Sequence, residues 1–272
     1  MDDQKVVLIT GASSGVGQST ARLLSQNGYR VFGTSRNPSG AKAIPTVQML
    51  ALDVRADASV SACVAAVLGQ AGRLDVLVNN AAYELAGALE ETSLEEAKAQ
   101  FETNFFGVVR MVRAVLPSMR GQKQGRIVNV SSLSGVSSIP FMGIYSASKF
   151  ALEGYTEALR MELKPFDIHV SLTEAGFLKT PMMDKRQVSA GRLKEYDPWR
   201  QRAFAAIREQ EEKSSGPELV AQTLLEIISS PAPRLRYLIG PQAKFVAGVK
   251  WFLPAGAYER AKMGNFGLKD SA

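Results

Sequence analysis

Short apolar runs alternate with amphipathic stretches along most of the chain. Six runs rich in β-branched residues have the length of buried strands, and they span residues 5–10, 30–35, 47–54, 74–80, 125–132 and 168–176. Helical spacing lies between them, near residues 17–27, near 58–68, from residue 92 onward and around residue 145. Because strands that alternate with helices form parallel sheets covered on both faces, the pattern predicts a doubly wound α/β sheet in a single domain, residues 1–272.

Two later segments depart from this alternation. Residues 185–215 mix aromatic side chains with a dense run of charges, which predicts a helical insertion with one solvated face. The segment QAKFVAGVKWFLP places Phe245, Val249 and Phe252 on one side of a helix. This apolar side could cover the active site, contact a partner subunit or contact a membrane surface. Packing in the core or against a subunit is favoured, because two lysines are weak evidence for membrane binding.

The length, composition and net charge of the chain exclude several classes of protein. The 272 residues are 46% hydrophobic and 21% charged, as in an ordinary soluble globular domain. No apolar run is long enough to span a membrane and no leader precedes the first strand, so a cytoplasmic protein without a membrane span is expected. The net charge of +6 comes from scattered basic residues, which disfavours nucleic acid and suits an anionic small molecule.

Cysteine and histidine each occur once. Cys63 lies in an alanine-rich run, where the expected role is that of a small buried side chain. His169 falls on a strand-like run. Neither has the neighbours that a zinc site with nitrogen and sulfur ligands needs, so no metal is expected. A triad with histidine as its base is excluded unless His169 supplies that base.

A glycine-rich turn, TGASSGVG, follows the first strand and opens the first helix. In this position backbone N–H groups and the helix N-terminus face an anion, and a dinucleotide pyrophosphate is the strongest candidate. An ordinary strand-to-helix connection is the alternative. The loop lacks the Gly-Lys-Ser/Thr ending of a nucleoside triphosphatase. The residues expected to bind the cofactor here are Gly11, Ser13, Ser14, Gly15, Val16 and Gly17.

The end of the second strand distinguishes between the two nicotinamide cofactors. An acidic residue at this place binds a ribose 2′-hydroxyl and repels a 2′-phosphate. The sequence has Ser35 and Arg36 instead, a hydroxyl and a guanidinium suited to a phosphate. NADP(H) is therefore predicted over NAD(H), with a solvated loop arginine as the alternative.

Tyr145 and Lys149 are four residues apart and share one face of a helix. An ammonium near a phenol favours the phenolate and lowers the pKa of the tyrosine, which makes it a usable general acid or base. Taken alone, the pair is more simply explained as a surface contact that supports its helix.

The segments TGASSGVG, NNAA, NVSS and YSASK stand in one order on one α/β chain. The sequence therefore resembles the short-chain dehydrogenase/reductase family over nearly its whole length, in the Tyr-x-x-x-Lys branch of alcohol dehydrogenases and carbonyl reductases. The resemblance implies a Rossmann fold and a catalytic tetrad of Asn104, Ser132, Tyr145 and Lys149. Asn104 would hold a water that links Lys149 to solvent, Ser132 and Tyr145 would donate to the substrate oxygen, and Tyr145 would deliver the proton.

The same resemblance implies further contacts with the cofactor. Asp53 and Val54 would border the adenine, and Thr180 would contact the nicotinamide carboxamide. Within NNAA, Asn79 would support the strand end, and Asn80 and Ala81 would lie against the cofactor. Two positions depart from the family pattern: Ala82 stands where glycine is usual and Ala175 where proline is usual. Both put the shape of the substrate pocket in doubt.

These observations predict an NADP(H)-dependent oxidoreductase that transfers a hydride between the nicotinamide and a carbonyl or secondary alcohol. A bulky apolar ketone or aldehyde is expected, because the chain is similar to hydroxysteroid and retinol dehydrogenases and has apolar side chains near the expected pocket: Phe141, Met142, Phe177, Met182 and Met183. The alternatives are an NAD(H) alcohol dehydrogenase working oxidatively and a catalytically silent NADP(H) sensor. The resemblance also implies a homodimer or homotetramer.

Overall fold

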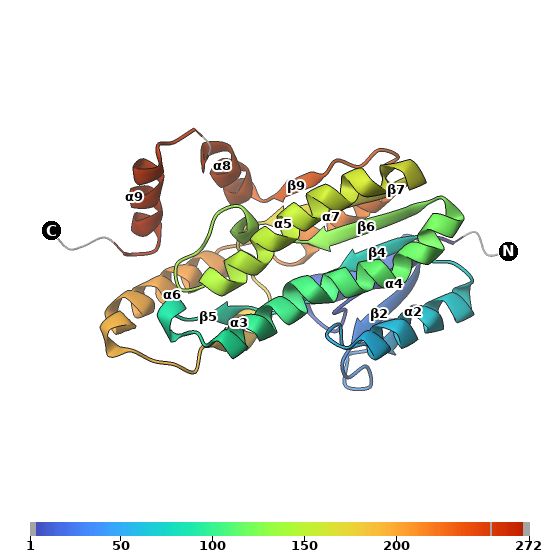
Figure 1. Ribbon diagram of the computed structural model, residues 1–272, viewed down its shortest axis with the longest axis horizontal. Coiled ribbons are helices and arrows are strands. Elements are labelled where there is room, and N and C mark those ends of the chain that lie inside the picture. The colour runs from blue at the N-terminus through green and yellow to red at the C-terminus, as the bar shows by residue number, and fades with distance from the viewer. Residues whose placement is uncertain (1–3, 251, 269–272) are drawn as a thin grey trace.

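The computed structural model describes residues 4–250 and 252–268, and within them seven parallel strands form one sheet (Figure 1). The strands are β1 (Val6–Ile9), β2 (Arg30–Ser35), β3 (Val47–Ala51), β4 (Val76–Asn79), β6 (Gly125–Val130), β7 (Ile168–Ala175) and β9 (Arg236–Ile239). Their order across the sheet is β3-β2-β1-β4-β6-β7-β9. The predicted doubly wound α/β fold is confirmed, and all six predicted apolar runs form strands.

Helices cover both faces of the sheet. One face carries α2 (Asp57–Ala71), α4 (Gly107–Gln122) and α5 (Gly143–Leu163). The opposite face carries α1 (Gly15–Gln26) and α7 (Glu218–Ser229). Successive side chains of a strand point to opposite faces, so Val6 and Leu8 of β1 join the first core while Val7 and Ile9 join the second.

A short helix, α3 (Leu94–Phe101), leads into α4 through one π-helical turn, Glu102–Phe106. The helix begins at a capping box, in which the Glu96 N–H donates to Ser93 Oγ at 3.1 Å and the Ser93 N–H donates to Glu96 Oε2 at 2.9 Å. A single π-turn inside a long helix often marks a functional site. This turn contains Asn104.

The predicted insertion contains one helix and one short strand. The helix is α6 (Asp197–Glu212), which buries one face and leaves the other solvated, as expected. The strand is β8 (Gln187–Val188), which pairs with β5 (Leu85–Ala86). The sequence pattern missed β5 and β8, because runs of two residues carry too little periodicity to be distinguished from loops. It also missed β9, which is buried at only two of its four positions, Tyr237 and Ile239.

Helices α8 (Pro241–Lys250) and α9 (Ala255–Asn265) follow β9 and extend away from the sheet (Figure 1). Phe245 is 69% exposed and Phe252 is 87% exposed, so the apolar side of this segment does not pack in the core of the chain. Packing against a subunit, the other part of that expectation, stays a prediction. Phe245 and Val249 instead line the cavity described below. Within the described ranges, no helix combines the length and apolar character needed to cross a membrane.

The order of the strands places a crevice at one edge of the sheet. The chain moves outward from β1 to β2 and β3, then returns to the other side of β1 to form β4. In a doubly wound sheet, ligands bind outside the carboxyl ends of the strands at this switch point. The loops that follow β1, β2, β4 and β6 carry most of the residues singled out in the sequence.

Candidate functional site

The glycine loop between β1 and α1 is shaped by its glycines. Gly11 and Gly15 have φ angles of +67° and +54°, in the left-handed region that favours glycine. A Cβ on Gly11 would lie 2.9 Å from the Cα of Ala81, and a Cβ on Gly17 would lie 2.3 Å from the Gly11 carbonyl oxygen. Gly11 and Gly17 therefore allow the loop, the first turn of α1 and the end of β4 to pack closely.

Side chains at neighbouring strand ends hold this loop. Asn80 Nδ2 donates to the Gly11 carbonyl at 3.0 Å, and the Gly11 N–H donates to Thr34 Oγ1 at 3.3 Å. Thr10 Oγ1 accepts from the N–H groups of Asn80 and Ala81 at 2.9 and 3.0 Å. The loop is thus tied to β1, β2 and β4, and its shape is fixed without a ligand.

A cavity of about 700 Å³ extends over the carboxyl ends of the strands. The predicted site residues that line it are Gly11, Ser13, Ser14, Gly15, Val16, Ser35, Arg36, Asp53, Val54, Asn80, Ala81, Ser132, Tyr145, Lys149 and Thr180. Gly17 and Asn104 are not among the residues that form its wall. Gly17 lies against the Gly11 carbonyl and so has a packing role, while its expected contact with the cofactor stays a prediction.

One end of the cavity is basic. Arg36 is exposed at its wall, and Arg55, which the sequence pattern did not single out, lines the same end. Arg55 Nη2 lies 2.6 Å from Asp53 Oδ2, and this hydrogen-bonded pair lowers the pKa of Asp53 to about 2. Ser35 Oγ donates to the Asn37 carbonyl at 3.2 Å. Two guanidinium groups and one carboxylate leave this end with net positive charge, which suits a phosphate.

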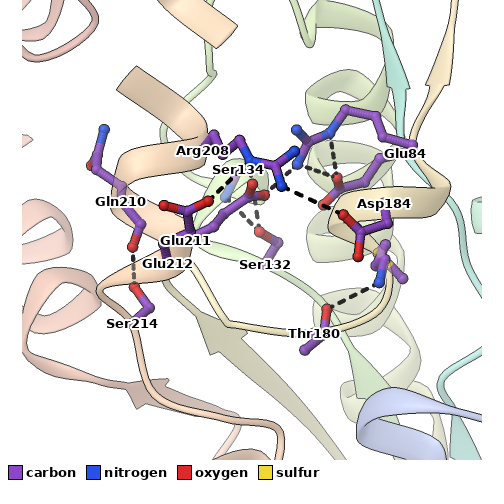
Figure 2. Close-up of polar contacts among 12 residues, drawn as sticks. Glu84, Ser132, Ser134, Thr180, Asp184, Arg208, Gln210, Glu211, Glu212 and Ser214 are labelled. Carbon is purple, nitrogen blue, oxygen red and sulfur yellow. Dashed lines mark hydrogen bonds and ion pairs between the residues drawn. The ribbon is translucent and has the colours of Figure 1, made fainter. Parts of the chain in front are cut away.

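Ser132, Tyr145 and Lys149 line the cavity together. Tyr145 and Lys149 lie on α5 and are 6% and 4% exposed. The Lys149 ammonium is 5.9 Å from the centre of the Tyr145 ring and donates to the Val130 carbonyl at 2.9 Å. Ser132 follows β6, and its Oγ accepts from the Ser134 N–H at 3.1 Å (Figure 2). Polar groups from α5 and from the end of β6 therefore lie together in a buried place. This excludes the interpretation of Tyr145 and Lys149 as a surface pair that only supports its helix.

The protonation of this group differs from the expectation. Burial raises the pKa of Tyr145, Glu84 raises it further, and a hydrogen bond with Ser132 opposes the rise. Burial also lowers the pKa of Lys149, to about 8. The expected lowering of the Tyr145 pKa is therefore wrong for the protein alone, because desolvation outweighs the hydrogen bond with Ser132 and the charge of Arg186, which oppose the rise. At neutral pH Tyr145 is a neutral phenol with a proton to donate.

Asn104 lies behind the cavity wall and is 1% exposed. Its Oδ1 accepts from the Tyr83 N–H at 3.1 Å, and its Nδ2 donates to the Tyr83 carbonyl at 3.0 Å and to Ser148 Oγ at 3.3 Å. Asn104 thereby fixes the segment after β4 against α5. Its expected role in holding a water stays a prediction. Asn79 supports the same strand end by donating from Nδ2 to Asn129 Oδ1 at 2.8 Å.

The other end of the cavity is apolar. Of the five predicted apolar residues, Phe177, Met182 and Met183 line the cavity, and α8 with the segment after it adds Phe245, Val246, Val249 and Leu253. Phe141 and Met142 do not form part of this wall. Phe141 makes edge-to-face contacts with Tyr196 and Phe204 instead, each with ring centres 6.3 Å apart.

An acidic pair, Glu84 and Glu211, also lines this end (Figure 2). Arg186 lies between them, with Nη2 2.8 Å from Glu84 Oε2 and a second ion pair to Glu211. All three side chains are at least 85% buried, with exposures of 15%, 12% and 6%. Sequence patterns could not have found this group, because its members are 102 and 25 residues apart along the chain.

The residues present fit a nicotinamide dinucleotide. Gly15 lines the cavity, and a Cβ added to it would have its nearest neighbours, Thr180 and Pro181, at 4.0 Å, so the loop is not crowded at this position. The N-terminus of α1, which begins here, suits a pyrophosphate. The two arginines, the glycine loop and Tyr145 all line one cavity. Such a cofactor would lie in this cavity, with its phosphates at the N-terminus of α1.

Known proteins resemble this chain in sequence and in fold. The family model described as short chain dehydrogenase matches residues 5–190. A 3-ketodihydrosphingosine reductase of Bacteroides thetaiotaomicron is 43% identical over 251 residues, covering 91% of this chain and 93% of that protein. Retinol dehydrogenase 8 of Bos taurus is 37% identical, covering 94% of this chain and 88% of that protein.

Solved structures extend the likeness to the fold. A short-chain dehydrogenase from Streptomyces avermitilis superposes with a TM-score of 0.82 at 32% identity, covering 97% of this chain and 98% of that chain. A short-chain dehydrogenase/reductase from Burkholderia phymatum, in complex with NAD, has a TM-score of 0.75 at 30% identity and covers 92% of each chain. ElxO with NADP bound has a TM-score of 0.71 at 26% identity, covering 87% of this chain and 97% of that chain. The glycine loop, the parallel sheet and the family match agree, and the chain belongs to the short-chain dehydrogenase family.

Proposed function

We propose that this protein is an NADP(H)-dependent oxidoreductase that reduces a bulky apolar ketone or aldehyde to an alcohol. The observation that carries the proposal is the meeting of Ser132, Tyr145 and Lys149 in one cavity with the glycine loop. Relatives named for a ketodihydrosphingosine, a retinol and an estradiol support a bulky apolar substrate. The apolar walls around Phe177 and Met182 support it as well.

The side chains have complementary roles in the reduction. A bound nicotinamide supplies the hydride. The hydroxyls of Ser132 and Tyr145 donate to the substrate oxygen, where negative charge develops, and Tyr145 then delivers its proton. Because burial raises the pKa of Tyr145, the phenol keeps this proton at neutral pH. A protonated acid suits reduction, whereas oxidation of an alcohol by the same tyrosine needs a phenolate.

Lys149 holds positive charge beside this reaction. Its ammonium donates to the Val130 carbonyl, at the end of β6, and its pKa of about 8 keeps it mostly charged at neutral pH. That charge stabilises the phenolate left on Tyr145 after proton transfer. Asn104 keeps the segment after β4 in place against α5 and acts as a positioning residue.

Replacement of Tyr145 distinguishes the proposed enzyme from the alternative, a catalytically silent NADP(H) sensor. Tyr145→Phe removes the proton donor and is expected to abolish turnover of a ketone panel while NADPH affinity, measured by isothermal titration, stays within about threefold. Tyr155 is a half-buried tyrosine on the same helix outside the cavity wall, so Tyr155→Phe is the matched control and keeps turnover. Undiminished turnover by Tyr145→Phe contradicts the mechanism, and wild-type protein that binds NADPH but reduces no carbonyl supports the sensor.

The preference for NADP(H) rests on the basic end of the cavity. Arg36 and Arg55 border the position expected for a ribose 2′-phosphate. Arg36→Asp is expected to weaken NADPH binding at least about tenfold and to leave NADH binding equal or stronger. Arg22→Asp, on the exposed face of α1, is the control for the same change of charge. If Arg36→Asp weakened the binding of NADPH and NADH equally, the result would favour the NAD(H) alternative.

Assembly into a homodimer or homotetramer is part of the proposal. Large apolar side chains are exposed on the helices α3 and α5 and on the π-turn between α3 and α4: Leu94, Phe106 and Met161 are 71%, 45% and 69% exposed. Sedimentation measures this directly, and a monomer at micromolar concentration would contradict it. Location in the cytoplasm stays a prediction of the sequence.

A further inference from the structure

Two buried glutamates lie behind the cavity wall, on the face of the sheet that α5 covers. Glu153 on α5 is 6% exposed, and Glu174 on β7 is 1% exposed. Side chains alternate along a strand, so Glu174 points to the same face as Leu172, which belongs to the core under α5. Neither glutamate forms part of the cavity wall, so neither is placed to meet a substrate or a cofactor.

One arginine contacts both glutamates. Arg236, on β9, donates from Nε to Glu153 Oε2 at 3.1 Å, and the same nitrogen lies 3.2 Å from Glu174 Oε1. Its Nη2 lies 3.5 Å from a third acid, the exposed Glu157. Glu153 Oε1 and Glu174 Oε1 are buried and have no hydrogen-bond partner within the described residues. Two buried carboxylates around one guanidinium nitrogen are more negative than it can balance, and a proton shared between them removes the excess.

The two glutamates lie directly behind Lys149. Lys149 and Glu153 are four residues apart on α5, and a helical side chain leans toward the N-terminus, so Glu153 leans toward Lys149. A Cβ built on Gly135 would lie 3.1 Å from the Lys149 carbonyl oxygen and 3.1 Å from Glu153 Cγ. The same Cβ would lie 3.0 Å from Ser131 Oγ. The Lys149 ammonium donates to the carbonyl of Val130, the residue before Ser131, so the lysine and the glutamates approach each other at the end of β6.

Burial favours the protonated form of both acids. It raises the pKa of Glu174 to about 7, where Glu153 adds to the rise and Arg236 opposes it. It also raises the pKa of Glu153, although Arg236 and Lys149 oppose the rise. The charged groups that face the two acids are Lys149 and Glu157 from α5 and Arg236 from β9. Near neutral pH, a proton is therefore held beside a lysine whose own pKa is about 8.

We propose that Glu153 and Glu174 share one proton and act as a proton reservoir for Lys149. After Tyr145 has given its proton to the alkoxide, Lys149 protonates the phenolate. The two glutamates pass their shared proton to the neutral lysine, and water beside Arg236, which is 36% exposed, returns a proton to them. Each ketone reduced thus takes up one proton from solvent. The inference rests on the proposed carbonyl reduction, and it assigns positioning residues that act through Lys149.

The first test needs no substrate, because a protonated carboxyl has an infrared C=O stretching band that an ionised carboxylate lacks. At about pH 6, the difference spectrum of wild type minus Glu174→Gln is expected to contain this band, and the band is expected to disappear as pH rises through about 7. Glu157→Gln removes an exposed acid from the same arginine and is the control, whose difference spectrum shows no such band. If Glu174→Gln does not fold, Glu153→Gln takes its place. A wild-type spectrum in which no carboxyl band titrates near pH 7 overturns the inference.

Kinetics then connect the shared proton to turnover. Glu153→Gln and Glu174→Gln are each expected to lower kcat for reduction of a long-chain ketone by NADPH at least about tenfold, less than the loss of the general acid itself. The KM of the ketone and the affinity for NADPH are expected to stay within about threefold of wild type. In wild type, kcat is expected to fall as pH rises through about 7, because the glutamates lose their proton. Both variants lack this step, and Glu157→Gln keeps both kcat and the step.

A purely structural role gives a different result. If the glutamates only held β9 against α5, both variants would unfold at lower urea concentrations, while the folded variants would keep the pH dependence of kcat. That result overturns the reservoir. An active wild-type enzyme without the carboxyl band refutes this inference alone. If wild type reduces no carbonyl, the proposed function and the reservoir role fail together, and the infrared titration still shows whether the glutamates share a proton.

Discussion

The close packing at Gly17 predicts a specific defect when a methyl group is added there. In Gly17→Ala the new Cβ would lie 2.3 Å from the Gly11 carbonyl oxygen and 2.5 Å from Asn80 Nδ2. Ordinary contact begins at 3.4 Å, so the first turn of α1 and the loop must separate by about 1 Å. The carbonyl is backbone, and Asn80 is held by its bonds to Thr10 and Gly11, so neither neighbour moves away easily.

The size of the effect follows from a comparison within the chain. Overpacking of a well-packed site costs about 1–3 kcal/mol, while a helical Gly→Ala change gains about 0.5–1 kcal/mol. Gly69 lies in α2, and a Cβ there would meet nothing within 4 Å. Gly69→Ala is therefore expected to gain helix stability without any overpacking. The free energies of unfolding of the two variants are therefore expected to differ by about 1–3 kcal/mol, with Gly17→Ala the less stable.

Urea unfolding of wild type and both variants measures this difference, and isothermal titration of NADPH measures its effect on binding. Because the loop proposed to bind the pyrophosphate is displaced, Gly17→Ala is expected to bind NADPH at least about tenfold more weakly, while Gly69→Ala binds as wild type. If Gly17→Ala were as stable as Gly69→Ala and bound NADPH normally, the role assigned to Gly17 would be refuted.

Three further predictions concern single side chains. Burial raises the pKa of the Cys63 thiol to about 11, so a thiol reagent near neutral pH should label the unfolded chain but not the native protein, and rapid native labelling would contradict this. Burial lowers the pKa of Lys262 to about 8 from an ordinary 10.5; between these values the unfolded chain holds a proton that the folded chain has released, so stability rises with pH through this window, and Lys262→Met should flatten the rise measured by urea unfolding. If the stability of Lys262→Met rose with pH as steeply as that of wild type, Lys262 would not be the cause of the rise. Ser93→Ala removes the cap of α3 and should cost about 1 kcal/mol, measured against wild type in the same unfolding assay.

The strands and the loops that follow them were readable from the sequence. Parallel strands are buried on both faces, so β1 is a continuous apolar run, β4 is apolar up to its last residue, and β2 is buried at its four central positions. Gly11 and Gly15, after β1, have backbone conformations that other residues rarely adopt. The meeting of Ser132 with Tyr145 followed from family resemblance, and the fold explains it by placing the end of β6 against the start of α5.

The parts that the sequence did not reveal depend on contacts between distant segments. Glu84 and Arg186 lie in two separate loops and Glu211 lies in α6, and a local sequence pattern cannot reveal such a cluster. The protonation of Tyr145 was wrongly predicted for a related reason, because the depth of burial is a property of the packed molecule. Burial likewise separated Phe177, which lines the cavity, from Phe141, which packs elsewhere.

The central claim is that this protein transfers a hydride from NADPH to a ketone with Tyr145 as the acid. The most direct measurement incubates the protein with NADPH deuterated at the transferable position of the nicotinamide and a long-chain ketone, and analyses the product by mass spectrometry. The expected result is an alcohol with one deuterium on the carbinol carbon, formed by wild type and by Tyr155→Phe but not by Tyr145→Phe. An alcohol without deuterium, or no alcohol although NADPH binds, would contradict the account.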